Sequence, residues 1–510
     1  MPKYLFPGVY VEEIDTGNKP IEGVATSTAG FLGITERGPV DPMFISNFGE
    51  YQRNYGDYLK DRYLTYGIEG FFQNGGERCF VARVVPNDPA TKTASGKFDG
   101  MEVTAIGPGK WGENVAVKIN KAALDDGTPS TKDFFKLTLI YWPAKPPAPV
   151  VDPSDPANNN DPKRVEPRVL ETYDNLVPTQ SATNFYERQV NSSSVLVTVK
   201  LTGAGRPVNK PLTFLSGAND GAEIDVTDVT DALDRLEAID EVSILCCPDE
   251  NDFPPISNAL TTQCETLKDR FAILQAPNPA PPLSTHGPTV VSRYAAYYHP
   301  WLRITNPVTQ LPMEIPPGGH VAGVYARSDI ERGVHKAPTN EIIRGLYVDP
   351  LDPTAGMKVQ VTKAEQDVLN PRGVNVLRYF TGRGNLVWGA RTTTLDPDWK
   401  YVNVRRLFIF AEKSIEKATQ WVVFEPNDEP LWARVRRNVS AFLTRLWMDG
   451  MLQGRTKEEA YFVRCDRTTM TQADINNGKL IVLIGMAPVK PTEFVIFRIG
   501  QWTGGSEVSE

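Results

Sequence analysis

The sequence predicts a multi-domain α/β protein, in which an α/β sheet domain is interrupted by an inserted β-rich domain and followed by an α+β C-terminal domain. Three observations predict this class. The chain has 510 residues, which corresponds to about three domains of roughly 150 residues. Strand and helix patterns alternate near the N-terminus, stop, and resume later, with strand-like runs between them. The last third of the chain then becomes rich in tryptophan and arginine.

The first 28 residues have the pattern of an extended arm. Residues 8–14 alternate as a short strand, and residues 15–28 are polar and contain Gly17 and Gly23. Such a composition is typical of a flexible tether. We therefore expect an N-terminal arm over residues 1–28, consisting of a donor strand and a tether that spans about 46 Å when extended.

The α/β domain is predicted in two pieces, residues 29–89 and 218–345. In the first piece, a helix pattern at residues 64–74 lies between strand patterns at 30–35 and 79–85, which indicates a βαβ unit. The second piece continues the alternation through helix 226–239, strand 242–247, helix 256–269 and strand 271–276.

Residues 90–217 separate these two pieces and are expected to form an inserted outer domain rich in β-structure. Alternating runs at residues 111–119, 134–142 and 193–201 predict strands. Residues 143–167 carry eight prolines in 25 residues, a composition that cannot bury a core. This segment is predicted to be an exposed, mobile loop on the outside of the protein.

The C-terminal domain is expected over residues 346–490. Its strand patterns lie at residues 374–380 and 385–392, and its helix patterns at 404–415 and 431–447. The last of these helices carries apolar residues at three- and four-residue spacing, namely Trp432, Val435, Val439, Phe442 and Leu446.

The same helix has a basic side formed by Arg434, Arg437 and Arg445. Basic helices can bind nucleic acid or anionic membranes, but the surrounding chain is acidic and has no tract rich in lysine and arginine. We favour a packed helix whose arginines meet carboxylates, which can belong to this chain or to another subunit.

Residues 491–510 are expected to form a C-terminal arm. Its strand pattern is apolar on both faces, with Phe494 and Ile496 on one face and Val495, Phe497 and Ile499 on the other. A strand of this kind requires neighbours on all sides. Two terminal strands of this type indicate strand donation between chains, a head-to-tail contact that propagates.

Composition and charge exclude several classes of protein. The formal net charge is −8, which does not indicate a polyanion-binding protein, and no apolar stretch approaches the roughly 20 residues of a membrane span. The N-terminal residues lack the basic and apolar regions of a signal peptide, so synthesis in the cytosol is expected. The five cysteines show no metal-site spacing and are expected to be reduced core residues. With four scattered histidines, histidine-based and metal-dependent catalysis are disfavoured.

The most enzyme-like feature is the acidic cluster Asp249, Glu250 and Asp252, which directly follows an apolar strand. Carboxylates at the end of such a strand could hold a divalent cation, as in a metal-dependent hydrolase. We favour the alternative that these acids stabilise the N-terminus of the next helix. The glycines of residues 382–389 match no nucleotide-binding fingerprint and indicate a turn or bulge.

Several motifs together resemble one protein family. The blocks are YLFPGVYVEEI at residues 4–14, GVATSTAGFLGITERGP at 23–39, FFQNGGERCFVARVV at 71–85, GHVAGVYARSDIERGVHKAPTNE at 319–341 and GMAPVKPTEFVIFRI at 485–499. These blocks resemble contractile tail sheath proteins, most closely the sheaths of extracellular, phage-tail-like contractile injection systems. Residues 90–217 are the least similar part.

This resemblance implies a structural subunit and not an enzyme, with no catalytic residue, cofactor or metal. It implies homo-oligomeric six-membered rings, stacked helically around an inner tube and held in a metastable extended state until a baseplate triggers contraction. The partners would be the chain itself, the tube protein, and baseplate and terminal cap proteins, without nucleic acid or direct membrane insertion. The particle would assemble in the cytoplasm and be released or anchored at a membrane. The length of the chain and its two terminal arms disfavour the alternative that it is a tube protein or a baseplate subunit.

In the family, the two arms of neighbouring subunits pair with a strand in the C-terminal domain. By position, the segments that would exchange here are Val9, Tyr10, Val11, Glu12, Glu13, Ile14 and Phe494, Val495, Ile496, Phe497, Arg498, Ile499. The resemblance also implies contact with the tube through a charged helix, for which Lys457, Glu458 and Glu459 are the candidates. The alternative is a solvated helix start, with acids near its positive end.

Overall fold

The computed structural model describes residues 20–128, 132–203 and 205–496. They form a mixed α/β protein with one large mixed sheet and smaller antiparallel sheets. The chain divides into two compact units. One holds residues 24–334 and 338–402, and the other holds the chain up to residue 23, residues 335–337 and the chain from residue 403 onward. No helix among the described residues is long and apolar enough to cross a lipid bilayer.

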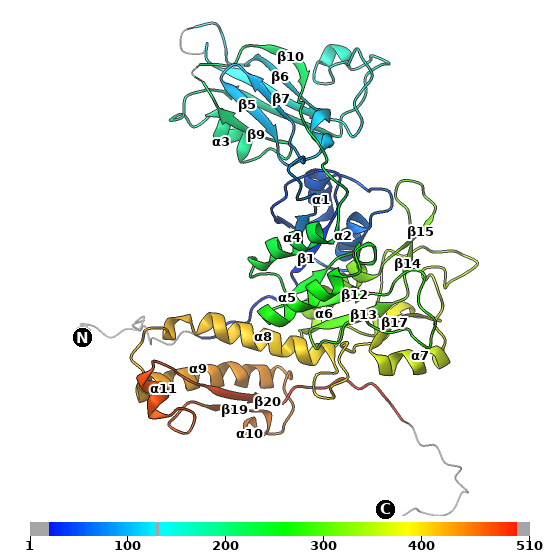
Figure 1. Ribbon diagram of the computed structural model, residues 1–510, viewed down its shortest axis with the longest axis vertical. Coiled ribbons are helices and arrows are strands. Elements are labelled where there is room, and N and C mark those ends of the chain that lie inside the picture. The colour runs from blue at the N-terminus through cyan, green and yellow to red at the C-terminus, as the bar shows by residue number, and fades with distance from the viewer. Residues whose placement is uncertain (1–19, 129–131, 204, 497–510) are drawn as a thin grey trace, which may run out of the picture. The chain divides into compact units, whose positions relative to one another are not determined.

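The first unit is built on a nine-stranded sheet (Figure 1). Its strands, in spatial order, are β16 (Glu341–Ile342), β18 (Gly384–Val387), β17 (Val374–Phe380), β13 (Ala295–His299), β12 (Phe271–Gln275), β11 (Ile244–Cys246), β1 (Ala29–Gly33), β3 (Cys79–Arg83) and β2 (Met43–Ile45). The strands from β17 to β3 run parallel, and the pairs at both ends are antiparallel. The strands β3 and β11 are far apart in the sequence but flank β1, so two separate stretches of the chain form one sheet.

Helices cover both faces of this sheet, because β1, β11, β12 and β13 are buried along their whole length. Helices α4 (Val226–Glu237) and α5 (Ile256–Leu267) pack together, as do α2 (Leu64–Gln73) and α6 (Gly318–Arg332). The second pair approaches very closely, since a Cβ atom on Gly319 would lie 2.2 Å from the carbonyl oxygen of Gly67. A short helix, α1 (Phe48–Tyr55), precedes α2.

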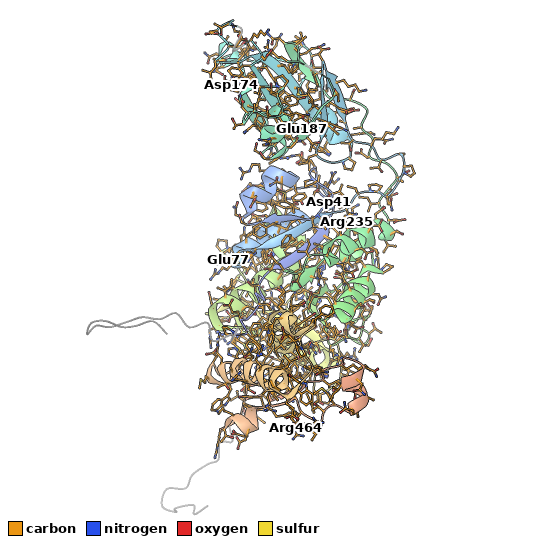
Figure 2. All side chains as sticks on the ribbon, turned by 90° about the vertical axis from the view of Figure 1, so that its left-hand side faces the viewer. Asp41, Glu77, Asp174, Glu187, Arg235 and Arg464 are labelled. Atoms are coloured by element: carbon orange, nitrogen blue, oxygen red, sulfur yellow. The ribbon has the colours of Figure 1, made fainter. Side chains whose placement is uncertain are left out.

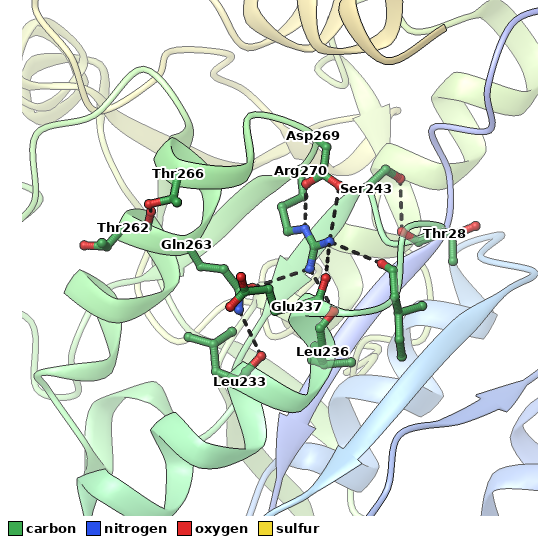
Figure 3. Close-up of polar contacts among 11 residues, drawn as sticks. Thr28, Leu233, Leu236, Glu237, Ser243, Thr262, Gln263, Thr266, Asp269 and Arg270 are labelled. Carbon is green, nitrogen blue, oxygen red and sulfur yellow. Dashed lines mark hydrogen bonds and ion pairs between the residues drawn. The ribbon is translucent and has the colours of Figure 1, made fainter. Parts of the chain in front are cut away.

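The buried side chain of Arg270 joins α4 to the sheet (Figure 3). Its guanidinium donates hydrogen bonds to the carbonyl oxygens of Leu236, at 3.0 Å, and Ile239, at 3.2 Å, and pairs with Asp269 at 2.7 Å. These carbonyls lie at the C-terminal end of α4, where helical partners are missing. A buried cation therefore satisfies this helix end.

The expected boundary at residue 346 does not coincide with a boundary between the two units. Strand β17 pairs in parallel with β13, and β18 pairs with β17, so both strands belong to the large sheet. The change in composition near residue 345 therefore falls inside the unit. The same part of the chain contains the hairpin β14 (Leu302–Thr305) and β15 (Pro312–Ile315), and helix α7 (Lys363–Leu369).

Between β3 and α4 the chain forms two further antiparallel sheets, as expected of a β-rich insertion. Their strands are β4 (Ser95–Phe98), β5 (Met101–Ala105) and β9 (Val197–Leu201) in one, and β10 (Lys210–Phe214), β6 (Val115–Lys121), β7 (Phe135–Tyr141) and β8 (Val169–Leu176) in the other. Helix α3 (Tyr186–Asn191), which carries Glu187 (Figure 2), packs on β9. The two sheets share an apolar core that includes Trp111, Phe135 and Leu139.

The proline-rich segment 143–167 contains no strand and is largely exposed. It is nevertheless tied to the body at several points. Asp152 pairs with Lys118 at 2.5 Å, and the carbonyl oxygen of Val165 accepts a hydrogen bond from Trp142 at 3.0 Å. The residues between these two anchors are mostly exposed, and the mobility of the loop stays a prediction.

The predicted tether differs from the structure over residues 20–28. Ile21 and Thr28 are buried, and a Cβ atom on Gly23 would lie 2.7 Å from the ring of Phe410. The Ser243 hydroxyl donates to the carbonyl oxygen of Thr28 at 3.0 Å (Figure 3). The prediction of a flexible tether is therefore wrong for residues 20–28, because the buried side chain of Ile21 anchors them. Residues 15–19 lie outside the described residues.

The second unit consists of two long helices and a small sheet (Figure 1). Its elements are α8 (Val402–Ala418), which begins in the first unit, α9 (Glu429–Met448), α10 (Lys457–Ala460), β19 (Tyr461–Arg464), α11 (Gln472–Asn476) and β20 (Leu483–Met486). The five apolar residues expected to form the packed side of α9 are all buried, which confirms that prediction.

Candidate functional site

The small sheet of the second unit has only two strands among the described residues. Strands β19 and β20 pair antiparallel, with Tyr461 opposite Met486 and Arg464 opposite Leu483. A two-stranded sheet on its own is only marginally stable in water. Helix α9 supports one side of this one, because the Tyr461 hydroxyl lies 2.7 Å from the Thr444 hydroxyl and donates to the carbonyl oxygen of Ser440 at 3.2 Å.

Among the described residues, the outward-facing backbone groups at both edges of this sheet have no hydrogen-bond partner. The N–H of Ala487 donates to the carbonyl oxygen of Ala460 at 2.9 Å, just beyond the paired residues. In an antiparallel ladder the direction of the backbone groups alternates along each strand. The N–H and C=O groups of Val463 therefore point away from β20, and those of Ile484 point away from β19. Each edge can accept another strand.

The outer face of the sheet carries exposed apolar side chains beside one cation, Arg464. A Cβ atom on Gly485 would lie 2.2 Å from the ring of Phe462, so this ring lies directly over the glycine of the opposite strand. The guanidinium of Arg464 (Figure 2) lies 5.4 Å from the centre of the same ring. Phe462 is 45% exposed and Leu483 is 50% exposed. This face offers an added strand apolar side chains to pack against.

The predicted C-terminal donor segment is exposed where the structure describes it. Phe494, Val495 and Ile496 are 69%, 68% and 79% exposed, and they are not part of a strand. Three consecutive apolar side chains in water are unusual for a chain that acts alone. The remaining predicted residues of this arm, Phe497, Arg498 and Ile499, lie outside the described residues.

The predicted N-terminal donor strand also lies outside the described residues. This applies to Val9, Tyr10, Val11, Glu12, Glu13 and Ile14.

The three candidate tube-contacting residues lie on α10, a single helical turn, and all three are exposed. Glu459 accepts a hydrogen bond from the backbone N–H of Arg455 at 2.7 Å. The backbone N–H of Glu458 and the hydroxyl of Thr456 hold the pKa of Glu458 below its ordinary value. The acids thus stabilise the local turn, as the alternative predicted, while Lys457 is open to solvent.

The acidic cluster after β11 does not converge on one point. Asp249 accepts a hydrogen bond from the N–H of Tyr63 at 2.6 Å, at the start of α2, and Asp252 pairs with Arg62 at 2.8 Å. Glu250 accepts hydrogen bonds from Ser257 and Gln275. Among the described residues no group of three potential metal ligands is found.

Burial dominates the electrostatics of this cluster. It raises the pKa of Asp249 to about 6 and that of Glu250 to about 7. Asp249 lies where the order of parallel strands reverses, between β1 and β11, a position where α/β enzymes bind ligands. Here Asp249 accepts a hydrogen bond at the N-terminus of α2, and Glu250 accepts one from Ser257 in the first turn of the following helix, so acids of the cluster contact both helix starts.

Two features of the site could not be found from the sequence patterns. The free edges of β19 and β20 depend on which strands are absent, and the strand pattern of residues 461–464 gives no such signal. The position of Phe462 over Gly485 depends on register. A glycine inside a strand is the only sequence signal that pointed to a close approach there.

Comparison with known families identifies two matching domains. The model of the phage tail sheath protein central domain matches residues 222–393, and that of the phage tail sheath C-terminal domain matches residues 394–501. The tail sheath protein of Vibrio phage KVP40 is 26% identical over 183 residues, which are 36% of this chain and 26% of that protein. The matched region thus spans about a quarter of that relative.

Solved structures cover nearly the whole chain. The helical sheath of the anti-feeding prophage in its contracted state is 26% identical, with a TM-score of 0.57, covering 98% of this chain and 99% of that one. The sheath complex of an extracellular contractile injection system, PVC, also contracted, has a TM-score of 0.59 and 23% identity over 98% and 99% of the two chains. The second likeness shows the fold alone.

Proposed function

The chain belongs to the phage tail sheath family, a family of structural proteins and not of enzymes, and we propose that it builds a contractile sheath by exchanging strands between copies. The observation that carries this proposal is the β19–β20 sheet, whose two edges are free among the described residues and whose outer face carries exposed apolar side chains. A donated strand would pair with the free backbone groups of an edge and cover the exposed apolar side chains at the same time.

The donors would be the two arms of neighbouring copies. Residues 9–14 of one copy and residues 494–499 of another would add to the free edges of β19 and β20. The exposed residues Phe494 and Ile496 support this assignment, because an added strand would bury them against the sheet or a further chain. Each copy would then be both donor and acceptor, so the contact extends without closing on a two-fold axis.

The assembled sheath would consist of stacked six-membered rings around an inner tube. We place the work of contraction in the packing between copies, because two lattice arrangements of one fold can differ by only a few kcal/mol per subunit. Strand exchange would keep the copies connected through that change. The particle would be an extracellular, phage-tail-like injection system, assembled with baseplate and terminal cap proteins.

Contact with the tube would involve the exposed turn at Lys457, Glu458 and Glu459. Since Glu459 already caps its own turn, Lys457 is the group best placed to meet a partner. Reversing the charge of Lys457 should weaken binding of the tube and leave sheath-to-sheath contacts intact. Tube-containing particles of normal yield from this variant would contradict the assignment.

The experiment that tests strand exchange removes one arm at a time. Chains lacking residues 1–14 or 491–510 should fold and stay soluble as monomers, yet fail to form cylinders in negative-stain microscopy. Circular dichroism and urea unfolding check the fold. Normal polymerisation of either truncated chain would refute the proposal.

A further inference from the structure

A single aromatic side chain stands out from the second unit at the turn between α8 and α9. Phe424 is 102% exposed, and its backbone φ is 69°. A bulky residue is an outlier in this left-handed region, and such conformations persist where the surrounding structure fixes them. The neighbouring Val423 is 61% exposed. Together they form an apolar knob.

The turn beneath the knob is held firmly. Asn427 donates to the carbonyl oxygen of Lys479 at 3.0 Å and accepts from the indole N–H of Trp432 at 2.7 Å. The guanidinium of Arg434 lies 5.2 Å from the centre of the Trp421 ring. The knob is therefore presented in a fixed position, which lowers the entropy lost when it binds a partner.

Acidic side chains surround the knob. Glu425 and Asp428 are exposed and follow Phe424 closely in the chain. In the described part of the chain, neither has a cationic side chain within ion-pair distance, although nearby Glu429 pairs with Arg467. The rim would therefore favour a partner with positive charge around a small apolar hollow.

The exposed face of α9 carries a small apolar residue flanked by two cations. Arg437, Ala441 and Arg445 are spaced by four residues and are all exposed, so they form one row along the helix. No carboxylate of the described residues lies within ion-pair distance of Arg437 or Arg445, whereas Arg405 in the same unit pairs with Glu412. The small alanine leaves space for a ring between two cations.

We propose that Phe424 of one copy packs over Ala441 of a second copy, between Arg437 and Arg445, with Glu425 facing one of these arginines. Phe424 and Ala441 of the same chain cannot meet, because Ala441 lies about 18 Å along α9 from the first residue of this helix. An arginine beside an aromatic ring adds a favourable cation–π contact.

A second copy is the partner that the chain itself supports, because one chain carries both complementary halves. The contact is heterologous and therefore repeats along an assembly. It also opposes the repulsion between copies that each carry a net charge of −8. The inference rests on the proposed self-assembly and adds a contact outside the exchanged strands.

The first test exchanges the charges. Arg437→Glu should raise the concentration needed for polymerisation at least about tenfold, a usual cost for losing a central contact. Glu425→Arg alone should weaken assembly similarly, and the double variant should recover most of it. The double variant distinguishes this contact from binding of the tube, which would not be rescued by a change at Glu425.

The second test traps the contact directly. The five native cysteines are buried, so Val423→Cys and Ala441→Cys introduce the only exposed thiols in the described part of the chain. Mild oxidation of the assembled double variant should give a ladder of disulfide-linked copies. Pairing Val423→Cys with Gln472→Cys, an exposed position on α11, serves as the matched control and should give none.

The outcomes separate this inference from the proposed function. Cylinders that form normally without a ladder, and with no effect of Arg437→Glu, would overturn the contact and leave strand exchange standing. If Arg437→Glu polymerises normally but no longer binds the tube, the contact is also overturned. The row of Arg437, Ala441 and Arg445 would then be a tube-binding surface. A wild-type chain that stays monomeric at all concentrations would overturn both.

Discussion

The nine-stranded sheet and the β19–β20 sheet show two ways of treating a sheet edge. The large sheet ends in β2 and β16, which are three and two residues long, and its central strands β1, β11, β12 and β13 are buried along their whole length. Short edge strands are a common protection against unwanted pairing. In the part of the chain that the structure describes, the small sheet has two free edges and exposed apolar residues. The first sheet is complete within one chain, whereas we propose that the second is completed by assembly.

The sharpest way to test this comparison is to block one free edge without disturbing the ladder of the chain itself. The N–H of Val463 points away from β20, so Val463→Pro removes no hydrogen bond between β19 and β20. We expect a folded monomer that forms no cylinders, because an added strand would lose a backbone partner. Electron microscopy and sedimentation measure assembly, and urea unfolding measures the fold.

Arg464→Pro is the matched control, since its N–H points toward β20. We expect this variant to lose stability in the monomer, by roughly 2–3 kcal/mol, as well as assembly. If Val463→Pro destabilises the monomer as strongly as Arg464→Pro, the alternation of the ladder is wrong. If it assembles normally, this edge is not the acceptor.

A substitution in the unit built on the nine-stranded sheet should lower the stability of the monomer itself. Gly319→Ala places a Cβ atom against the backbone of Gly67, which cannot move away as a flexible side chain can. We expect the free energy of unfolding of an arm-truncated monomer to fall by about 3 kcal/mol or more.

The control for that change is Gly49→Ala in the exposed part of α1, where the nearest atom to an added Cβ lies 3.4 Å away. Because alanine favours the helix, this variant should gain about 0.5–1 kcal/mol. A Gly319→Ala variant as stable as wild type would mean that α2 and α6 do not pack as closely as the structure shows.

The buried acids of the large sheet should make its stability depend on pH. Burial raises the pKa of Glu250 from 4.5 to about 7, so folding takes up a proton between these values. Its contribution is therefore present at pH 4 and is lost as the pH rises, by about 2 kcal/mol between pH 5 and pH 7.

Glu250→Gln should reduce the fall in the free energy of unfolding between pH 5 and pH 7. Urea unfolding at these two pH values measures it. His320 acts in the opposite direction, because burial lowers its pKa to about 4 and stability is lost as the pH falls below 6.5. A slope unchanged by Glu250→Gln would show that Glu250 is already ionised at pH 5.

The large sheet could be predicted well from the sequence because each part carries a local signal. The strands β1, β3, β11 and β12 are short apolar runs between helices with helical periodicity, and βαβ units place such strands side by side. The membership of β17 could not be predicted, because an apolar strand does not indicate which sheet it joins. The change of composition near residue 345 was interpreted as a domain boundary, but it falls inside the first unit.

The candidate site could be predicted only as far as its terminal donor segment, and the strand expected there stays a prediction, since residues 494–496 are exposed and not part of a strand. Its acceptor edges are defined by missing neighbours, which no local pattern records. Likewise, residues 20–28 look flexible in the sequence because they are polar and contain glycine, and a single apolar residue, Ile21, is enough to anchor them. The exposure of Phe424 depends on how the turn is held by distant residues such as Lys479.

The smallest effect is expected in the inserted domain, at the part of its proline-rich loop that lies between the two anchors. Residues 155–161 are mostly exposed and lie between Asp152, which pairs with Lys118, and Val165, which pairs with Trp142. Replacing them with a glycine–serine linker of equal length should change stability by no more than about 0.5 kcal/mol and leave assembly unchanged. Lys118→Met, which removes an anchor, should cost about 1–2 kcal/mol and still allow assembly. Both follow because this domain has its own core and contributes no element to either of the sheets compared above. If the linker variant folds but fails to form cylinders, the loop lies at an interface between copies, and the small sheet is not the only surface that assembly completes.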